Sequence, residues 1–490
     1  MPAKLLTKSK YLNGLQCPRF LWVACNDPDL IPAPGLAQQH IFDQGHLVGD
    51  LAKQLYPGGT DISTDSFMAN IKNTRELLKG RHPIYEAGLM SGRIYSRIDI
   101  LVPAEKDAWD IVEVKSSTSV KDQNIDDVSF QKYTCEQSGL KINRCFLVHI
   151  NNEYVKMGDI EPGKLFKVVD ISNDVSEKIV GMEERINGML ETIDCRERPG
   201  AEIGARCSSP FDCPLIEIDC WKGLPEHHVF TLYRGGKTSQ EMYQNGIIDL
   251  AAVPSGYKLN DKQQIQCDCI THGTPHVDAK LVKEFLSTLH YPLYFFDFET
   301  IGTAVPLFDG THPYQNVPFQ YSLHVKDGPN SFLLHFEHLA EGTGDPRPEL
   351  LKHLKAELGK KGSILVYNRS FEQNVLQELG QAFPEYKKWS EAVIERLVDL
   401  IIPFRNFHYY HPSQHGSASI KHVLPAITGK GYDGLDITKG DEASIRYLQA
   451  TYGNVSIEEN SKTRAALLEY CGLDTMGMVD IVHSLEEITR

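Results

Sequence analysis

The chain has 490 residues, of which 41% are hydrophobic, and a formal net charge of −15 at pH 7. This length predicts two to four domains with real hydrophobic cores, and the acidic balance argues against a protein that coats nucleic acid through a basic surface. It does not exclude an enzyme that acts on nucleic acid, because metal-binding carboxylates add negative charge and a basic groove can be local.

Nothing in the sequence indicates export or membrane insertion. The first ten residues are basic and polar and lack the apolar core of a signal peptide. No stretch is apolar for long enough to span a bilayer. We therefore expect a cytoplasmic protein without membrane association. Eleven cysteines in a reducing compartment are more often metal ligands or buried thiols than disulfides.

The distribution of motifs predicts an α/β protein in three parts: a domain at 1–225, a small helical connector at 226–285 and a second domain at 286–490. In the connector, Cys267-Asp-Cys269 with His272 and His276 could form a second metal site, but the preferred interpretation is ordinary loop residues. Apolar patterns predict strands at 98–102, 110–114 and 145–150, with a helix at 128–139, and hence a mixed sheet. In the second domain they predict strands at 294–298 and 363–367 and a long terminal helix at 465–486.

A group of polar side chains in the first domain has the spacing of a metal-dependent nuclease core. Glu113 and Lys115 are two apart on a predicted strand and share a face, and Asp99 lies on the preceding strand of a predicted hairpin. Two carboxylates that converge there can hold Mg²⁺ or Mn²⁺, which polarises a phosphodiester and activates water. Lys115 would orient that water or stabilise the developing charge. Glu86 is a candidate further metal ligand, and Gln131 is a candidate for positioning the site or the substrate.

The same region resembles a known nuclease family. Gly-Arg-Ile-Tyr-Ser-Arg-Ile-Asp-Ile at 92–100, followed by Ile-Val-Glu-Val-Lys-Ser-Ser at 111–117, resembles the PD-(D/E)XK nucleases of the RecB-like branch. Phe130-Gln131-Lys132-Tyr133 stands where that branch carries its glutamine motif, and His46 lies near its upstream metal-binding histidine. The resemblance implies a restriction-endonuclease-like mixed sheet that cuts DNA with a divalent metal.

Four cysteines flank these motifs. Cys17 precedes them, and Cys207, Cys213 and Cys220 follow within fourteen residues, which favours a metal-binding group over four unrelated buried thiols. Four thiolates can hold either a [4Fe–4S] cluster or zinc. The one-plus-three arrangement resembles the iron–sulfur subset of RecB-like nucleases, which includes CRISPR-associated proteins. That resemblance implies a structural [4Fe–4S] cluster joining the ends of the nuclease domain.

The second domain carries a second set of acids. Asp297 and Glu299 are two apart on an apolar strand, and Tyr470 and Asp474 are four apart on a helix, so the members of each pair share a face. Together with Glu372 they can build a two-metal site, in which Asp297, Glu299 and Asp474 are the predicted metal ligands. Tyr470 would orient the attacking water.

These acids also resemble known motifs. Asp-Phe-Glu-Thr at 297–300, Asn-Arg-Ser-Phe-Glu at 368–372 and Tyr-Cys-Gly-Leu-Asp at 470–474 resemble the three motifs of DnaQ-like (DEDD) exonucleases of the tyrosine subtype. That superfamily has an RNase H-like fold and trims 3′ ends with two metal ions. Its middle acid is usually Asp where this chain has Glu372, and Asp399 is the alternative. The run at 416–425 resembles the helix-start segment before the third motif.

These patterns together predict a metal-dependent nuclease that hydrolyses DNA, single-stranded or at ends, with RNA as the other substrate to consider. A second hypothesis is a nucleic-acid-binding or assembly module in which one or both sites are inactive. An iron–sulfur redox protein has less support, because no Gly-rich flavin or nucleotide loop is evident. The sequence does not identify a protein partner.

Overall fold

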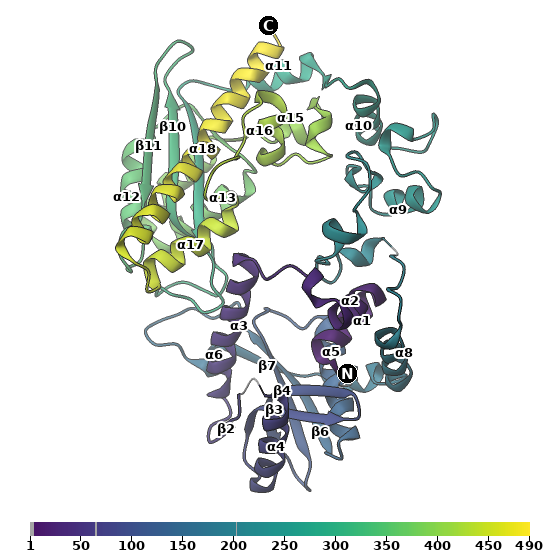
Figure 1. Cartoon of the computed structure of the whole chain (residues 1–490). Helices are drawn as coiled ribbons and strands as arrows, with labels where there is room; N and C mark the ends of the chain where they lie inside the picture. The colour runs from purple at the N-terminus through teal and green to yellow at the C-terminus, as the bar shows by residue number, and fades with distance from the viewer. Residues whose placement is uncertain (1–3, 64–65, 202) are drawn as a thin grey trace. The chain divides into compact units, whose positions relative to one another are not determined.

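The computed structural model describes residues 4–63, 66–201 and 203–490, and the chain forms two compact units (Figure 1). Unit 1 comprises Met1–Lys222 and Thr303–Tyr314, and unit 2 comprises Gly223–Gly302 and Gln315–Arg490. The chain therefore passes between the units three times. The sequence predicts a separate connector and an uninterrupted last domain. In the structure the connector residues belong to unit 2, and a segment of twelve residues inside the last domain belongs to unit 1.

Unit 1 is built on a mixed seven-stranded sheet. Its main strand order is β2-β3-β4-β5-β6-β7, with β1 beside β4. The pairs β3–β4, β4–β5 and β6–β7 are antiparallel. Strands β5 and β6 are parallel, as a crossover through helix α5 requires. The strands are β1 Leu6–Thr7, β2 Thr60–Asp61, β3 Ile84–Ser91, β4 Ile94–Pro103, β5 Trp109–Lys115, β6 Ile142–Ile150 and β7 Phe166–Asp170.

Helices cover both faces of this sheet. On one face Ile98 and Ile111 pack with Val128 of α5, and on the other face Ile100 packs with Val48 of α3. Burial on both faces explains why these strands are almost continuously apolar. The helices are α1 Lys8–Gln16, α2 Pro18–Asn26, α3 Leu36–Lys53, α4 Phe67–Leu77, α5 Asp122–Gln137, α6 Pro162–Leu165, α7 Ser172–Lys178 and α8 Met182–Asp194.

The predicted elements of the first domain are present. The strands predicted at 98–102, 110–114 and 145–150 lie within β4, β5 and β6, so the mixed sheet is confirmed. The predicted helix at 128–139 is α5, which begins six residues earlier and ends at Gln137. Its first turn is closed by the Asn124 side chain, which accepts a hydrogen bond from the Lys121 backbone N–H at 2.9 Å. A helix start without a Ser, Thr or Asp cap gives a weak sequence signal.

The segment at 303–314 is anchored on unit 1 by its own contacts. Ala304 and Val305 lie in the apolar cluster of Val48. Lys156 Nζ lies 2.7 Å from Asp309 Oδ1, and the Tyr314 hydroxyl donates to the Ser116 carbonyl oxygen. The segment is therefore a structural part of unit 1, although it lies in the sequence between two strands of unit 2.

Unit 2 contains a mixed five-stranded sheet with the order β11-β10-β9-β12-β13. Strands β9, β10 and β11 are antiparallel neighbours, whereas β9, β12 and β13 are parallel neighbours. Phe296 and Phe298 of β9 pack with Leu350 and Leu376, which belong to helices α12 and α13. The alternate residues of β9 face the other side of the sheet, where α18, yellow in Figure 1, crosses β9 and β10.

The elements of unit 2 include those predicted from the sequence. The strands predicted at 294–298 and 363–367 are β9 and β12, and the predicted terminal helix lies within α18. Cys267 and Cys269 are buried on α10, so their interpretation as loop residues was wrong. The strands are β8 His276–Val277, β9 Leu293–Ile301, β10 Val317–Lys326, β11 Leu333–Leu339, β12 Ser363–Val366, β13 Leu397–Asp399 and β14 Tyr409–Tyr410.

The helices of unit 2 are α9 Gly236–Gln244, α10 Asp261–His272, α11 Ala279–Ser287, α12 Arg347–Glu357, α13 Ser370–Ala382, α14 Lys387–Ile394, α15 Ile402–Arg405, α16 Ile420–Thr428, α17 Gly440–Tyr452 and α18 Ile457–Ile488. In the described part of the chain, no helix combines the length and the apolar character needed to cross a bilayer.

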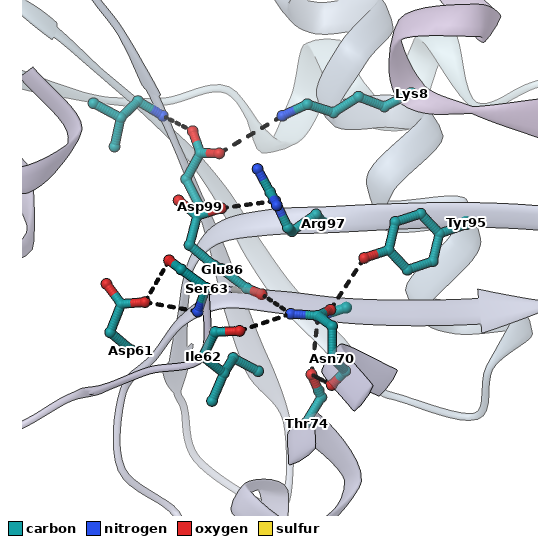
Figure 2. A network of polar contacts seen from close by, with 12 residues as sticks. Lys8, Asp61, Ile62, Ser63, Asn70, Thr74, Glu86, Tyr95, Arg97 and Asp99 are labelled. Carbon is teal, nitrogen blue, oxygen red and sulfur yellow. Dashed lines mark hydrogen bonds and ion pairs between the residues drawn. The ribbon is translucent and has the colours of Figure 1, made fainter. Parts of the chain in front are cut away.

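A buried asparagine ties α4 to the sheet beside Glu86 (Figure 2). The Asn70 side-chain N–H groups donate to the carbonyl oxygens of Ile62, at 3.1 Å, and Glu86, at 2.8 Å, and its Oδ1 accepts from the Tyr95 hydroxyl at 3.1 Å. Glu86 has a φ of +59°, in the left-handed region, where a residue other than glycine costs about 1–3 kcal/mol. Asn70 therefore holds the carbonyl of a strained residue that is also a predicted metal ligand.

We expect Asn70→Ala to lower the thermal unfolding midpoint, because it leaves two carbonyl oxygens and one hydroxyl buried without their partner. The expected cost is about 3 kcal/mol or more, because each of the three unsatisfied groups costs roughly 1–3 kcal/mol. Asn73→Ala, an exposed residue of the same helix, is the control. Equal midpoints for the two variants in a thermal scan would show that Asn70 does not hold this region together.

Candidate functional site

The β3–β4–β5 sheet brings the predicted acids of unit 1 together. The residue pairing between β3 and β4 is interrupted at one position, where Glu86 would face Asp99. These two residues are the metal ligands predicted from the two strands. The Val114 backbone N–H donates to Asp99 Oδ2 at 2.9 Å, so Asp99 is held against β5. Glu113 and Lys115 are alternate residues of β5, and Lys115 Nζ lies 2.6 Å from Glu113 Oε1.

Two lysines neutralise these carboxylates. Lys8 Nζ lies 2.9 Å from Glu113 Oε1 and 3.6 Å from Asp99 Oδ1. Lys115 Nζ lies 2.7 Å from Asp127 Oδ2, in addition to its contact with Glu113. Glu113 and Asp127 are buried. Burial by itself would lower the pKa of both lysines, but the surrounding carboxylates raise it above the usual value, so both remain charged.

Gln131 orients the two buried acids rather than standing apart from them. Its Nε2 donates to Glu113 Oε2 at 2.7 Å and to Asp127 Oδ1 at 2.9 Å. Sequence reasoning missed Asp127, although it lies one helical turn before Gln131 and therefore on the same face of α5. It also missed Lys8, which it treated only as part of a basic N-terminus. A lysine far from the motif in sequence carries no local signal for its role.

The unit 1 acids open into a cavity of about 1060 Å³. Arg97 Nε lies 2.8 Å from Glu86 Oε2, and Figure 2 shows both side chains close to Asp99 and Lys8. Burial, and then the charge of Asp99, raises the pKa of Glu86. The cavity lining includes the predicted residues Glu86, Asp99, Glu113 and Lys115, together with His46 of α3.

The four predicted cysteines lie in one hydrophobic cluster of unit 1. Cys213 is buried, and Cys17, Cys207 and Cys220 are partly buried around the Phe20 side chain. Burial raises the pKa of Cys213, and the nearby thiols of Cys17 and Cys207 add to this effect. Burial also raises the pKa of Cys220 to about 11. The buried thiols therefore stay protonated unless a cation binds them.

Polar contacts already hold the two ends of the cysteine cluster together. Gln16 Nε2 donates to the carbonyl oxygens of Arg206, at 2.9 Å, and Phe211, at 2.6 Å. Arg19 Nε donates to Asp219 Oδ2 at 2.7 Å. A tetrahedral zinc ion, with zinc–sulfur bonds of about 2.3 Å, holds its sulfurs about 3.8 Å apart. Among the described residues, no three of the cluster's sulfurs lie within 4.8 Å of one another, so the thiols are not arranged as a preformed site for a single ion.

The predicted residues of unit 2 converge on one cavity of about 360 Å³. Asp297 and Glu299 come from β9, Tyr470 and Asp474 from α18, and Glu372 from the first turn of α13. All five line the cavity. Strand alternation and helical spacing therefore bring together acids that lie up to 177 positions apart in the sequence.

These carboxyl groups are deficient in positive charge. Burial, and then repulsion from neighbouring acids, raises the pKa of both Asp297 and Glu299 well above the usual value. Burial raises the pKa of Asp474 to about 6, although the hydrogen bond from the Tyr432 hydroxyl and the charge of Lys421 oppose the rise. Without a bound cation the site therefore retains protons that isolated carboxyl groups would lose.

The middle acid of the site is Glu372. Its Oε2 is buried and has no hydrogen-bond partner within the described parts of the chain, and burial, followed by the charge of Asp297, raises its pKa. Asp399, the alternative considered from the sequence, instead accepts hydrogen bonds from the backbone N–H groups of Asn368, at 3.0 Å, and Ile401, at 3.2 Å. Asn368 has a φ of +78°, so Asp399 stabilises a strained turn that precedes α13.

Three side chains near this site were missed from the sequence. Cys471 Sγ lies 3.9 Å from Asp297 Oδ2. Lys421 Nζ lies 5.2 Å from the Tyr470 ring centre and 5.5 Å from the Tyr432 ring centre. Cys471 directly follows the motif tyrosine, and Lys421 lies in the run at 416–425 noted from the sequence, so both had a local signal, whereas Tyr432 is brought in by the fold.

A family described as "Domain of unknown function (DUF2779)" matches residues 294–419. The matched segment contains Asp297, Glu299 and Glu372 and ends before α18 supplies Tyr470 and Asp474.

Three relatives share part of the sequence. "Uncharacterized protein MG366 homolog" of Mycoplasma pneumoniae is 31% identical over 206 residues, which cover 38% of this chain and 31% of the relative. "Uncharacterized protein MG366" of Mycoplasma genitalium is 28% identical over 215 residues, which cover 40% of this chain and 32% of the relative. "Uncharacterized protein UU173" of Ureaplasma parvum is 31% identical over 144 residues, which cover 27% of this chain and 21% of the relative. The chain thus spans about one third or less of the length of these curated relatives.

In the absence of divalent metal, we expect Asp474→Asn to stabilise the protein more at about pH 7.5 than at about pH 4. The folded state keeps the Asp474 proton up to about pH 6, above the usual value of 3.8. Protonation of Asp474 therefore contributes its full free energy to folding below about pH 3.8, and this contribution is lost as the pH rises through about 6. Asparagine, which is always neutral, avoids the loss.

The measurement is the thermal unfolding midpoint in a chelator across this pH range. Asp433→Asn, which alters an exposed carboxylate of the same unit, is the control and should give no gain that depends on pH. A gain from Asp474→Asn that is the same at both ends of the range would contradict the assigned charge state.

Proposed function

We propose that this protein is a metal-dependent nuclease that hydrolyses DNA phosphodiester bonds, in single strands or at ends. The observation that carries the proposal is the convergence of Asp297, Glu299, Glu372, Tyr470 and Asp474 on one cavity of unit 2. Carboxyl groups that keep their protons in the absence of a cation are suited to binding divalent metal ions, because the ions remove the repulsion between them. The unpartnered Glu372 oxygen supplies a further ligand position.

In unit 2 the four acids would hold Mg²⁺ or Mn²⁺, which when bound polarises the phosphodiester and activates water. The Tyr470 hydroxyl would orient that water. Lys421, held over the rings of Tyr470 and Tyr432, adds a positive charge at the cavity that can bind a substrate phosphate. The finer proposal is an RNase H-like fold with 3′–5′ exonuclease action. Its support is the strand order of the sheet. The central strand β9 has the antiparallel neighbour β10 on one side and the parallel neighbour β12 on the other.

In unit 1 we propose a restriction-endonuclease-like site. Glu86, Asp99 and Glu113 would bind the metal, and Lys115 would orient water or stabilise the developing charge. Lys8 already contacts Glu113 and Asp99, so a divalent ion at these oxygens must displace its ammonium group. The displaced Lys8 then lies in the cavity, where it can bind a phosphate of the nucleic acid.

For Cys17, Cys207, Cys213 and Cys220 we propose a structural [4Fe–4S] cluster. The support is the shared hydrophobic cluster of four thiols that come from the two ends of the first domain, together with the resemblance of their one-plus-three arrangement to that of iron–sulfur nucleases. An iron–sulfur cube distributes its four thiolates over a larger volume than a single zinc ion does, and it would join α2 to the segment at 207–220.

One observation favours the second candidate, a nucleic-acid-binding or assembly module with an inactive site. In unit 1 the Lys8 ammonium already provides positive charge to Glu113 and Asp99. A centre that keeps this lysine in place would bind nucleic acid without cutting it. No comparable lysine contact is present at Asp297 or Glu299 among the described residues, so this alternative applies to unit 1.

We expect anaerobically purified protein to cleave end-labelled single-stranded DNA only when Mg²⁺ or Mn²⁺ is present. Asp297→Ala should reduce release from the 3′ end by about 100-fold or more, because it removes a metal ligand from unit 2. Lys115→Ala should reduce the remaining cleavage by a similar factor while DNA binding persists. Gel analysis of DNA labelled at the 3′ end or at the 5′ end distinguishes the loss of 3′-end release from the loss of the remaining cleavage.

The control for this assay is Lys79→Ala, an exposed lysine of unit 1 that pairs only with a helix neighbour in the contacts described. If Lys115→Ala cleaves like the control, unit 1 is a binding module and the second candidate holds for it. If no variant and no wild-type preparation with an intact cluster cleaves DNA or RNA, the proposed function is wrong.

We expect Cys213→Ser to lose iron and acid-labile sulfide and to lower the unfolding midpoint of unit 1, because Cys213 is the most buried ligand. Cys195→Ser, an exposed cysteine outside the cluster, should retain both. Metal analysis of anaerobically purified protein is the measurement. Wild-type protein that contains zinc in place of iron and sulfide would overturn the iron–sulfur assignment.

A further inference from the structure

The unit 2 centre contains a sulfur atom that the acidic motifs do not require. Cys471 lies on α18 between Tyr470 and Asp474, and it is buried beside the carboxylates of β9. We propose that Cys471 is a ligand of one metal ion in this centre, and that this ion is a transition-metal cation rather than Mg²⁺. The inference rests on the metal centre proposed above for unit 2 and specifies which ion it takes.

The distances suit coordination of a single ion. One ligand atom each from Asp297, Glu299 and Cys471 can be chosen so that all three lie within 4.8 Å of one another. Cys471 Sγ is 3.9 Å from Asp297 Oδ2. With metal–oxygen bonds of about 2.1 Å and metal–sulfur bonds of about 2.3 Å, ligands of one ion lie about 3 to 4.4 Å apart. Small side-chain movements therefore bring all three atoms into one coordination shell.

The helix presents the thiol toward the same face as the motif acid. Cys471 and Asp474 are three residues apart on α18, so they lie on adjacent turns of one face. A divalent cation there would offset the negative charge of the buried thiolate and of the Asp297 and Glu299 carboxylates beside it.

The sulfur decides the class of metal. Mg²⁺ is a hard ion that takes oxygen ligands in near-ideal octahedral geometry, whereas thiolates favour softer ions and affinity rises from Mn²⁺ toward Co²⁺ and Zn²⁺. The other buried cysteines of unit 2 offer a comparison. Cys267 and Cys269 pack in apolar clusters on α10, so they are matched in burial but lie outside the carboxylate site.

The test uses full-length protein from which divalent metal ions have been removed by a chelator while the proposed [4Fe–4S] cluster is kept. Titration with Co²⁺ is followed by sulfur-to-metal charge-transfer absorption, and titration with Cd²⁺ by cadmium NMR, both of which report sulfur ligands directly. We expect wild type and Cys267→Ser to show one site with a single sulfur ligand and Cys471→Ser to lack it. Calorimetry should show that the preference for Mn²⁺ over Mg²⁺ falls by about tenfold or more in Cys471→Ser.

The outcomes separate this inference from the proposed function. If Cys471→Ser keeps the sulfur signal and the metal preference, Cys471 is a packing residue and the inference is overturned. In that case loss of metal binding in Asp297→Asn still supports the nuclease proposal. If Asp297→Asn binds metal like wild type, the proposed centre itself is wrong. Should Cys471→Ser fail to fold by circular dichroism, Cys471→Ala provides the same comparison.

Discussion

Buried negative charge is the constraint on which both candidate centres depend, because a carboxylate removed from water needs a compensating partner. The two units meet this need differently. In unit 1, Lys8 and Lys115 surround Glu113 and Asp127, so the acids are paired with ammonium groups. In unit 2, the acids around Asp297 lack such contacts among the described residues, and burial together with mutual repulsion raises the pKa values of Asp297 and Glu299, while burial raises the pKa of Asp474.

If the two candidate centres bind metal ions as proposed, this difference would set how each of them responds. A cation that enters unit 2 replaces protons on groups that are already close together, so binding competes with pH rather than with protein side chains. A cation that enters unit 1 competes with an internal ammonium group whose effective concentration is high. On the proposed function, the two centres would therefore fill at different metal concentrations, and a phosphate that draws Lys8 away from Glu113 would favour filling of unit 1.

The parts of this structure that were predictable follow short-range rules. Alternation along β9 places Asp297 and Glu299 on one face, and a helical turn places Asp474 beneath Tyr470. Lys8 obeys no such rule, since it reaches Glu113 from 105 positions away, and only the assembled sheet brings them together. The division into units was also hidden, because the anchoring of a segment on one unit depends on tertiary contacts that neither composition nor periodicity records.

The segment at 303–314 determines where a gene could be cut without dividing either unit. Unit 1 takes its last twelve residues from within the coding sequence of unit 2, so a single recombination at Lys222 cannot deliver either unit intact. A gene fragment that ends there lacks Asp309, the partner of Lys156, and the Tyr314 side chain that contacts Ser116. A fragment that carries all of unit 1 must therefore extend to Tyr314 and includes the first part of unit 2.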